Sequence, residues 1–256
     1  MNLTRLNDDL AVALAWLTRL PVTYPSNQPR LSDAAWSFPL VGLVVGAIGA
    51  AGFMLFVGLG ASHLTAGALT VGLMLLLTGG LHEDGLADFF DGLGARGGAT
   101  EKLAAMRDSR VGTYGVLALI VILIVRVSAL YGVGTSLDAL VLVAACVIAR
   151  AAMVWAMSAH ALARADGAAR QAGQPDSAVV ARATALALVI VATLAFAVPY
   201  GIAGIVLAPL LAFAVAVSVC RRALAHFGGM TGDVYGAVCL LSETAALVLL
   251  VMILPV

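Results

Sequence analysis

The sequence predicts an all-α protein, a polytopic bundle of about seven transmembrane helices that forms a single domain over residues 1–256. Two observations carry this prediction. Hydrophobic residues make up 62% of the chain and charged residues only 11%, a composition typical of integral membrane proteins. Apolar runs close to the roughly 20 residues that cross a bilayer as a helix also recur along the chain.

The opening segment predicts an amphipathic helix that lies at the membrane surface and ends at Leu20-Pro21. Asp8, Asp9 and a late Arg19 interrupt its apolar residues. This pattern does not match a cleavable signal peptide.

The spans follow in order after this helix. We expect them near residues 37–60, 63–81, 112–133, 138–158, 183–200, 201–219 and 236–255. Counts of six or eight also fit, because the fifth and sixth spans share only a short turn at Val198-Pro199-Tyr200-Gly201.

The basic residues fall in every second loop, and the short loops between them, around Ser62, Gly134 and Tyr200, contain no Lys or Arg. Loops rich in Lys and Arg stay in the cytoplasm. The amino terminus is therefore expected inside, and the carboxyl terminus outside. The basic residues outside the predicted spans are Arg5, Arg19 and Arg30, then Arg96, Lys102, Arg107 and Arg110, then Arg164, Arg170 and Arg182, and finally Arg221 and Arg222.

The remaining composition excludes other classes. A formal net charge of zero argues against nucleic-acid binding. Cys146, Cys220 and Cys239 lie in or beside apolar runs without paired spacing. They are expected to be buried residues, forming neither a disulfide framework nor a zinc site.

The most informative motif is LHEDGLADFFDG, where an apolar run meets water. Asp84, Asp88 and Asp91 are spaced i, i+4 and i+7, which places three carboxylates within an arc of about 60° on a helix. Carboxylates held this close repel one another unless a cation lies between them. The spacing, with Glu83 beside it, indicates a divalent metal site that holds a phosphorylated substrate on the cytoplasmic face. The alternative is a solvated loop whose acids balance nearby arginines, the reading we favour for Glu101.

A basic segment follows the acidic motif. Arg107, Ser109 and Arg110 are candidate ligands for a pyrophosphate, because guanidinium groups bind phosphate oxygens that a metal leaves free. Asp108 is a candidate general base or further metal ligand, and His82 is the other candidate base. A plain surface patch of ion pairs would also explain this segment.

Two further sets of residues bear on the site. Arg126 and Arg150 lie inside predicted spans, where a charge usually faces the bundle interior. Arg150 is therefore expected either to bind an anionic substrate or to pair with Asp138 or Glu243. Near the last span, Thr231 and Gly232 could turn backbone N–H groups toward phosphate and Asp233 could ligate the metal, with an N-cap at Asp233 as the alternative.

Together these residues resemble the cobalamin synthase family, the adenosylcobinamide-GDP ribazoletransferases of cobamide nucleotide-loop assembly. The resemblance runs along the whole chain. It rests on residues 17–22, 38–42, 81–94, 106–119 and 228–237 with Glu243.

The resemblance implies a Mg²⁺-dependent enzyme of the cell inner membrane. It would transfer the adenosylcobinamide-phosphate group from adenosylcobinamide-GDP to α-ribazole or its 5′-phosphate, and release GMP. Catalysis would depend on Asp84, Asp88 and Asp91, with Arg107 and Arg110 clamping phosphate. Membrane lipid would surround the protein, and an oligomer is compatible with the sequence.

Two other functions share part of the pattern. Asp88, Asp91, Gly92, Ala95 and Arg96 fit the opening of the CDP-alcohol phosphotransferase motif, but the rest of that motif is absent. A secondary transporter would place its carboxylates near the bilayer midplane and show repeat symmetry. The clustered interfacial acids favour a transferase.

Overall fold

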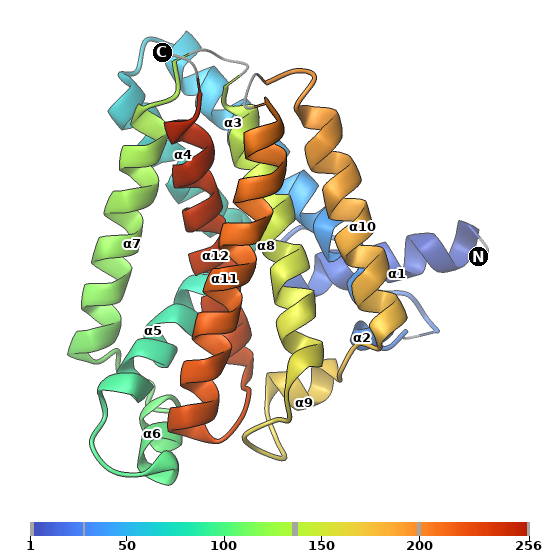
Figure 1. Cartoon of the computed structure of the whole chain (residues 1–256), viewed down its shortest axis with the longest axis vertical. Helices are drawn as coiled ribbons and strands as arrows, with labels where there is room; N and C mark the ends of the chain where they lie inside the picture. Colours follow the sequence, from blue (N-terminus) through green and yellow to red (C-terminus); the bar gives the residue numbers. More distant parts are fainter. Residues whose placement is uncertain (1–2, 28, 135–137, 199–200, 255–256) are drawn as a thin grey trace.

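The protein is an all-helical bundle (Figure 1). The structure is a computed structural model that describes residues 3–27, 29–134, 138–198 and 201–254. Over this part of the chain no strand forms, and the helices are α1 (Leu3–Leu17), α2 (Leu31–Ala34), the 3-10 turn η1 (Ala35–Ser37), α3 (Phe38–Gly58), α4 (His63–Thr78), α5 (Leu81–Gly94), α6 (Ala99–Ala105), α7 (Thr113–Tyr131), α8 (Leu140–Ala159), α9 (Ala168–Ala172), α10 (Ser177–Leu194), α11 (Gly201–Phe227) and α12 (Gly232–Met252).

Six of the described segments are long and apolar enough to cross a membrane: α3 with its preceding turns, α7, α8, α10, α11 and α12. The bent pair of α4 and α5 is a seventh if it counts as one span. The chain is therefore a multi-pass membrane protein, as predicted. Pro199 and Tyr200 of the predicted turn, and residue 255 of the last predicted span, lie outside the described residues.

The boundaries differ from the predicted ones where capping residues decide them. Helix α10 begins at Ser177 instead of near 183, because the Asp176 side chain accepts a hydrogen bond from the N–H of Val179. Helix α12 begins at Gly232 instead of near 236, after an N-cap at Thr231. Helix α11 continues to Phe227 beyond the predicted end at 219. The capping residues Asp176 and Thr231 therefore set the starts of α10 and α12.

Helices α8 and α12 form the centre of the bundle. Most of their side chains are buried, whereas fewer than a third of those in the spanning windows of α7, α10 and α11 are buried. The exposed side chains on these outer helices include Ile124, Val189 and Leu210. In a bilayer such faces contact lipid.

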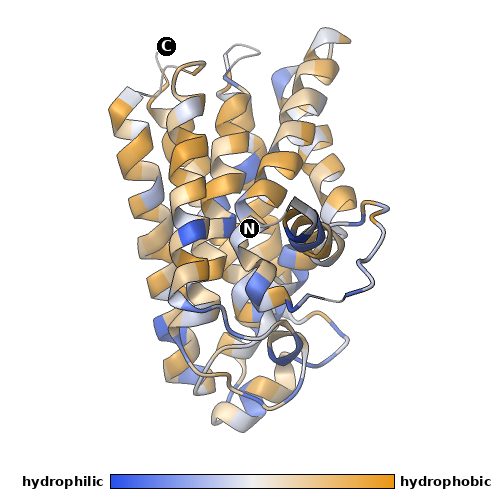
Figure 2. Cartoon of the chain, turned by 90° about the vertical axis from the view of Figure 1, so that its right-hand side faces the viewer, coloured by the Kyte–Doolittle hydropathy of each residue, from blue (hydrophilic) through white to orange (hydrophobic). Residues whose placement is uncertain are grey.

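Helix α1 lies crosswise to the long helices, beside α2, η1 and α3 (Figures 1 and 2). Its Asp9 is buried and accepts a hydrogen bond from the indole N–H of Trp36. This arrangement agrees with the predicted interfacial helix, although the helix ends at Leu17 instead of Leu20. Figure 2 shows most hydrophilic residues in the half of the bundle away from the C-terminus.

Candidate active site

The acidic helix α5 is set at an angle by a hinge of two glycines. Gly79 and Gly80 both adopt φ +68°, in the left-handed region that favours glycine. They end α4 after Thr78, three residues before the predicted end of that span, and α5 departs at 92° to α4. The predicted span over 63–81 is therefore replaced by a shorter helix and a sharp bend.

The face of α5 that carries Gly85 packs closely against α12. A Cβ atom at Gly85 would lie 2.9 Å from the carbonyl oxygen of Asp233 and 3.2 Å from the Cα of Gly236. Only small residues allow the backbones of two helices to approach this closely. The contact brings Asp233 of α12 to the acidic helix.

Three aspartates lie on α5 where electrostatic repulsion acts between them. Asp84 is exposed, and Asp88 and Asp91 are partly buried. Asp88 lies within electrostatic range of Asp84, Asp91 and Asp233. In the described residues no three acidic, histidine or cysteine side chains converge closely enough to enclose a metal ion. The aspartates therefore form a negatively charged patch without a preformed cage.

Asp91 has a second role at the start of α7. Its Oδ2 accepts a hydrogen bond of 2.7 Å from the N–H of Gly112, and its Oδ1 accepts one of 2.8 Å from the N–H of Gly115. These donors belong to the first turn of α7, where backbone N–H groups lack helical partners and favour negative charge. A Cβ atom at Gly112 or Gly115 would collide with the Asp91 carboxylate. Asp91 is therefore a cap contributed by a different helix.

Glu83 points away from the aspartates, into a buried ion cluster. Its Oε1 accepts a 2.9 Å hydrogen bond from Nη1 of Arg126, whose Nη2 lies 2.6 Å from Oε1 of Glu243. The other oxygen of Glu243 pairs with Arg150. We define these four residues as the buried ion cluster. It joins α5, α7, α12 and α8 with no net charge.

The buried ion cluster bears on two sequence-based expectations. Glu83, expected beside the metal ligands, has Arg126 as a partner for its Oε1. Arg150 is 2% exposed and paired with Glu243, so it does not line an accessible anion site. His82 is also buried, and its Nε2 has no hydrogen-bond partner among the described residues. His82 is therefore enclosed within the bundle, and its role as a base stays a prediction.

The basic segment after α6 is exposed and already paired. Arg110 donates to both oxygens of Asp108, at 3.1 and 2.9 Å, and Arg107 pairs with Asp166. The hydrogen bonds from Arg110 lower the pKa of Asp108 to about 2. Such a carboxylate is a weak base. Ser109 is exposed. No hydrogen bond or ion pair between residues 107–110 and the aspartates of α5 is present among the described residues.

The turn before α12 places a different arginine at the acids. Thr231 caps α12 by accepting from the N–H of Val234 at 3.3 Å, so the cap is Thr231 and not Asp233. Asp233 pairs at 2.9 Å with Arg164, a residue that the sequence reading did not assign to the site. Arg164 also acts electrostatically on Asp88. Gly232 begins α12 and lies beside α9, where a Cβ atom would be 3.2 Å from the Cβ of Ala168.

A cavity of about 490 Å³ adjoins the acidic helix, and we refer to it as the hinge cavity. It lies between the end of α1, the two-glycine hinge, α5 and α7. Its polar lining includes Thr18, Arg19, Thr78 and Asp84, with Trp16 as its aromatic residue. The exposed carboxylate of Asp84 therefore opens onto a space that can hold a ligand.

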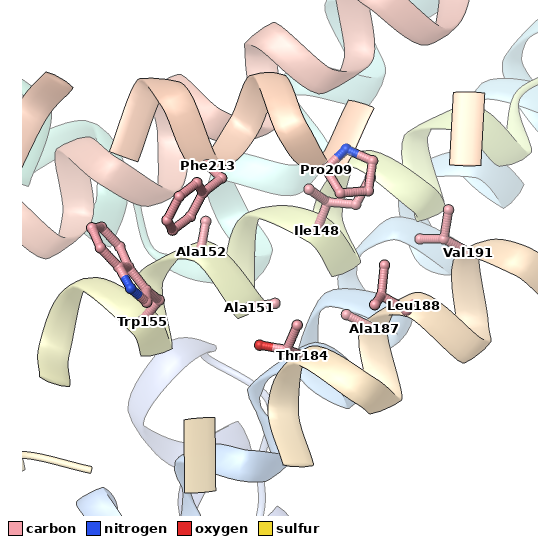
Figure 3. A pocket seen from close by; sticks show the side chains of 10 residues that line it. All are labelled: Ile148, Ala151, Ala152, Trp155, Thr184, Ala187, Leu188, Val191, Pro209 and Phe213. Atoms are coloured by element: carbon pink, nitrogen blue, oxygen red, sulfur yellow. The ribbon is translucent and has the colours of Figure 1, made fainter. Parts of the chain in front are cut away.

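A second cavity of about 310 Å³ lies between α8, α10 and α11 (Figure 3). Its lining is apolar apart from the hydroxyl of Thr184 and the indole N–H of Trp155. A charged phosphate would lose its hydration there without compensation. The hinge cavity is the better candidate for a phosphorylated substrate.

The comparisons with known proteins agree with one another. A family model described as Cobalamin-5-phosphate synthase matches residues 9–251. A protein of Allorhizobium ampelinum named adenosylcobinamide-GDP ribazoletransferase is 39% identical over 265 residues, covering 99% of this chain and 100% of that protein. One of the same name from Bradyrhizobium diazoefficiens is 40% identical over 232 residues, covering 90% and 87%. No solved structure matches the chain.

Proposed function

Because the chain belongs to the cobalamin-5-phosphate synthase family, an enzyme family, we propose that it is an adenosylcobinamide-GDP ribazoletransferase. It transfers the adenosylcobinamide-phosphate group of adenosylcobinamide-GDP to α-ribazole or α-ribazole 5′-phosphate. A hydroxyl oxygen of the acceptor bonds to the phosphorus that carries cobinamide, and the bond from that phosphorus to the bridging oxygen breaks. GMP leaves with the bridging oxygen, and the hydroxyl proton passes to a base or to water.

The observation that carries this proposal is the placement of Asp84 and Asp88. Asp84 is exposed at the hinge cavity, and Asp88 lies one helical turn further along α5 among other carboxylates. Hard oxygen donors suit Mg²⁺, which uses one or two carboxylates together with water and substrate phosphates. The absence of a three-ligand cage among the described residues is compatible with such binding.

We therefore propose that Asp84 and Asp88 hold Mg²⁺, with Asp233 as a neighbouring acid. Bound Mg²⁺ would neutralise pyrophosphate oxygens and the departing GMP. Arg164, paired with Asp233, lies where it can approach the same phosphates. Asp91 contributes by fixing the start of α7, and the cluster around Glu83 fixes the start of α5.

We propose the cell inner membrane as the location, with the acidic helix facing the cytoplasm. The basic residues of the α5–α7 and α8–α10 connections, such as Arg107 and Arg164, support this orientation. Both connections lie at the end of the bundle opposite the C-terminus (Figure 1).

The test uses the full-length protein in nanodiscs, given adenosylcobinamide-GDP and α-ribazole with Mg²⁺ or with EDTA. We expect cobalamin and GMP only with Mg²⁺. Asp88→Asn should lower the rate by about 10²- to 10³-fold, as removal of a charge-stabilising catalytic group does. Asp33→Asn, an exposed aspartate on α2, is the matched control and should keep wild-type activity. A folded wild type that forms no product refutes the proposed activity. Full activity in EDTA refutes the proposed requirement for Mg²⁺.

A further inference from the structure

We propose that the hinge cavity binds the acceptor nucleotide and that Arg19 holds its 5′-phosphate. This inference rests on the proposed function, which it extends by naming the cavity that holds the acceptor and the residue that recognises its phosphate. Arg19 belongs to neither the acidic motif nor the basic segment after α6, and its role follows from its place in the structure.

The hinge holds Arg19 in position at the cavity wall. Its backbone N–H donates to the carbonyl oxygen of Leu77 at 2.7 Å, which ties the end of α1 to the end of α4. Its side chain crosses the face of Gly79, where a Cβ atom would collide with the arginine Nε. The glycine that bends the chain therefore also makes room for the arginine.

The hinge cavity contains one guanidinium that no carboxylate neutralises by an ion pair among the described residues. Arg19 is the cavity's only cationic lining residue among those that the structure describes, and it forms no ion pair there. Glu83 lines the same cavity but is held by Arg126, and Asp84 is not within ion-pair distance. An exposed guanidinium without a partner provides several donors for a phosphate monoester.

The size and lining of the cavity favour the acceptor over the donor. A volume of about 490 Å³ lies within the range of roughly 300–1,000 Å³ that holds a drug-sized ligand. The corrin-bearing donor is much larger than such a ligand. Trp16 supplies an aromatic surface on which a planar base can stack. Asp84 lines the same cavity, so an acceptor bound there would lie in the same space as this proposed Mg²⁺ ligand.

The experiment compares two acceptors that differ only in the phosphate. The KM values of α-ribazole 5′-phosphate and of α-ribazole are measured with wild type, Arg19→Gln and the matched control Arg5→Gln, an exposed arginine on α1. Loss of a charge-assisted hydrogen bond should raise KM for the phosphorylated acceptor about 10- to 100-fold. KM for α-ribazole should stay within about twofold, as should both values in the control.

A binding measurement keeps the test independent of catalysis. Calorimetric titration of α-ribazole 5′-phosphate without Mg²⁺ should show the same loss in Arg19→Gln. If that variant does not fold, Arg19→Lys is used, which keeps the charge but loses the planar fork and should show a smaller, still phosphate-dependent, loss. Both titrations are run in phospholipid-free detergent and in nanodiscs with phosphatidylglycerol.

The outcomes separate the two proposals. A wild type that forms no product with either acceptor refutes the proposed function, whereas equal KM changes for both acceptors, or none, refute only the role of Arg19. A lipid phosphate could also occupy the cavity. Phosphate-dependent binding by Arg19 that phosphatidylglycerol abolishes would assign the site to lipid and overturn the acceptor assignment.

Discussion

Removal of one carboxylate from the buried ion cluster should destabilise the protein strongly. Glu243 accepts from both Arg126 and Arg150, and Glu83 accepts from Arg126 alone. Glu243→Gln leaves two buried guanidinium groups facing one carboxylate. Breaking a buried ion pair from one side typically costs about 3–5 kcal/mol. At about 2–4 °C per kcal/mol for a chain of this size, the midpoint of thermal unfolding should fall by about 6–20 °C.

A double substitution separates charge imbalance from loss of contacts. Arg150→Leu combined with Glu243→Leu removes one charge of each sign and leaves the Arg126–Glu83 pair intact. Replacing a buried pair by apolar residues is often neutral or stabilising, so the double variant should recover most of the loss. The midpoint of thermal unfolding of every variant is measured by tryptophan fluorescence during heating in the same detergent. If the double variant unfolds at or below the temperature of Glu243→Gln, the charge-balance reasoning is wrong.

Three further predictions test the assignments along the acidic segment. Glu83→Gln should lower thermal stability but leave the Mg²⁺ concentration for half-maximal activity unchanged within about twofold; a large rise in that concentration would make Glu83 a metal ligand instead. Gly115→Ala should lower activity and stability because its Cβ would displace the Asp91 carboxylate, whereas Gly72→Ala, with no atom within 4 Å of its Cβ, should not. The pKa of Asp108 is lowered to about 2, so it is ionised throughout pH 5–8. The contribution of its ionised carboxylate to stability is lost only as pH falls through about 2. Asp108→Asn should therefore keep the shape of the rate profile between pH 5 and 8; loss of the acidic limb would show that Asp108 is the base.

The membrane spans could be predicted because apolar composition alone decides them. Each long helix that could span appears close to its predicted place, and the main errors are at the ends. The signals for those ends were present in the sequence: Asp176 and Thr231 are typical N-cap residues, and the pair Gly79-Gly80 is a typical helix stop. The 92° bend was less predictable, because it depends on how α5 packs against α12.

The directions of the acidic side chains could be predicted only where helical periodicity determines them. Asp84 and Asp88 share one side of α5, as their spacing requires. Glu83 is one residue before Asp84, about 100° around the helix, and the same periodicity predicts that it faces another direction. The partners of these acids were not predictable. Arg126 is 43 positions from Glu83, and Arg164 is 69 positions from Asp233, and no local pattern links such residues.

Two carboxylates of α5 hold the helix in place, and two others are the proposed metal ligands. Glu83 anchors the first turn through Arg126, and Asp91 anchors the last through two N–H groups of α7. Because both ends are held by α7, the helix cannot rotate or slide without breaking an ion pair or uncapping that neighbour. Asp84 and Asp88, which lie between the anchors, have no such partner in the structure described. Repulsion between them is therefore opposed by the fixed ends of the helix, and a bound cation would relieve it. We propose that these fixed ends hold Asp84 and Asp88 ready for the Mg²⁺ proposed above, which is the preorganisation that a charge-stabilising site requires.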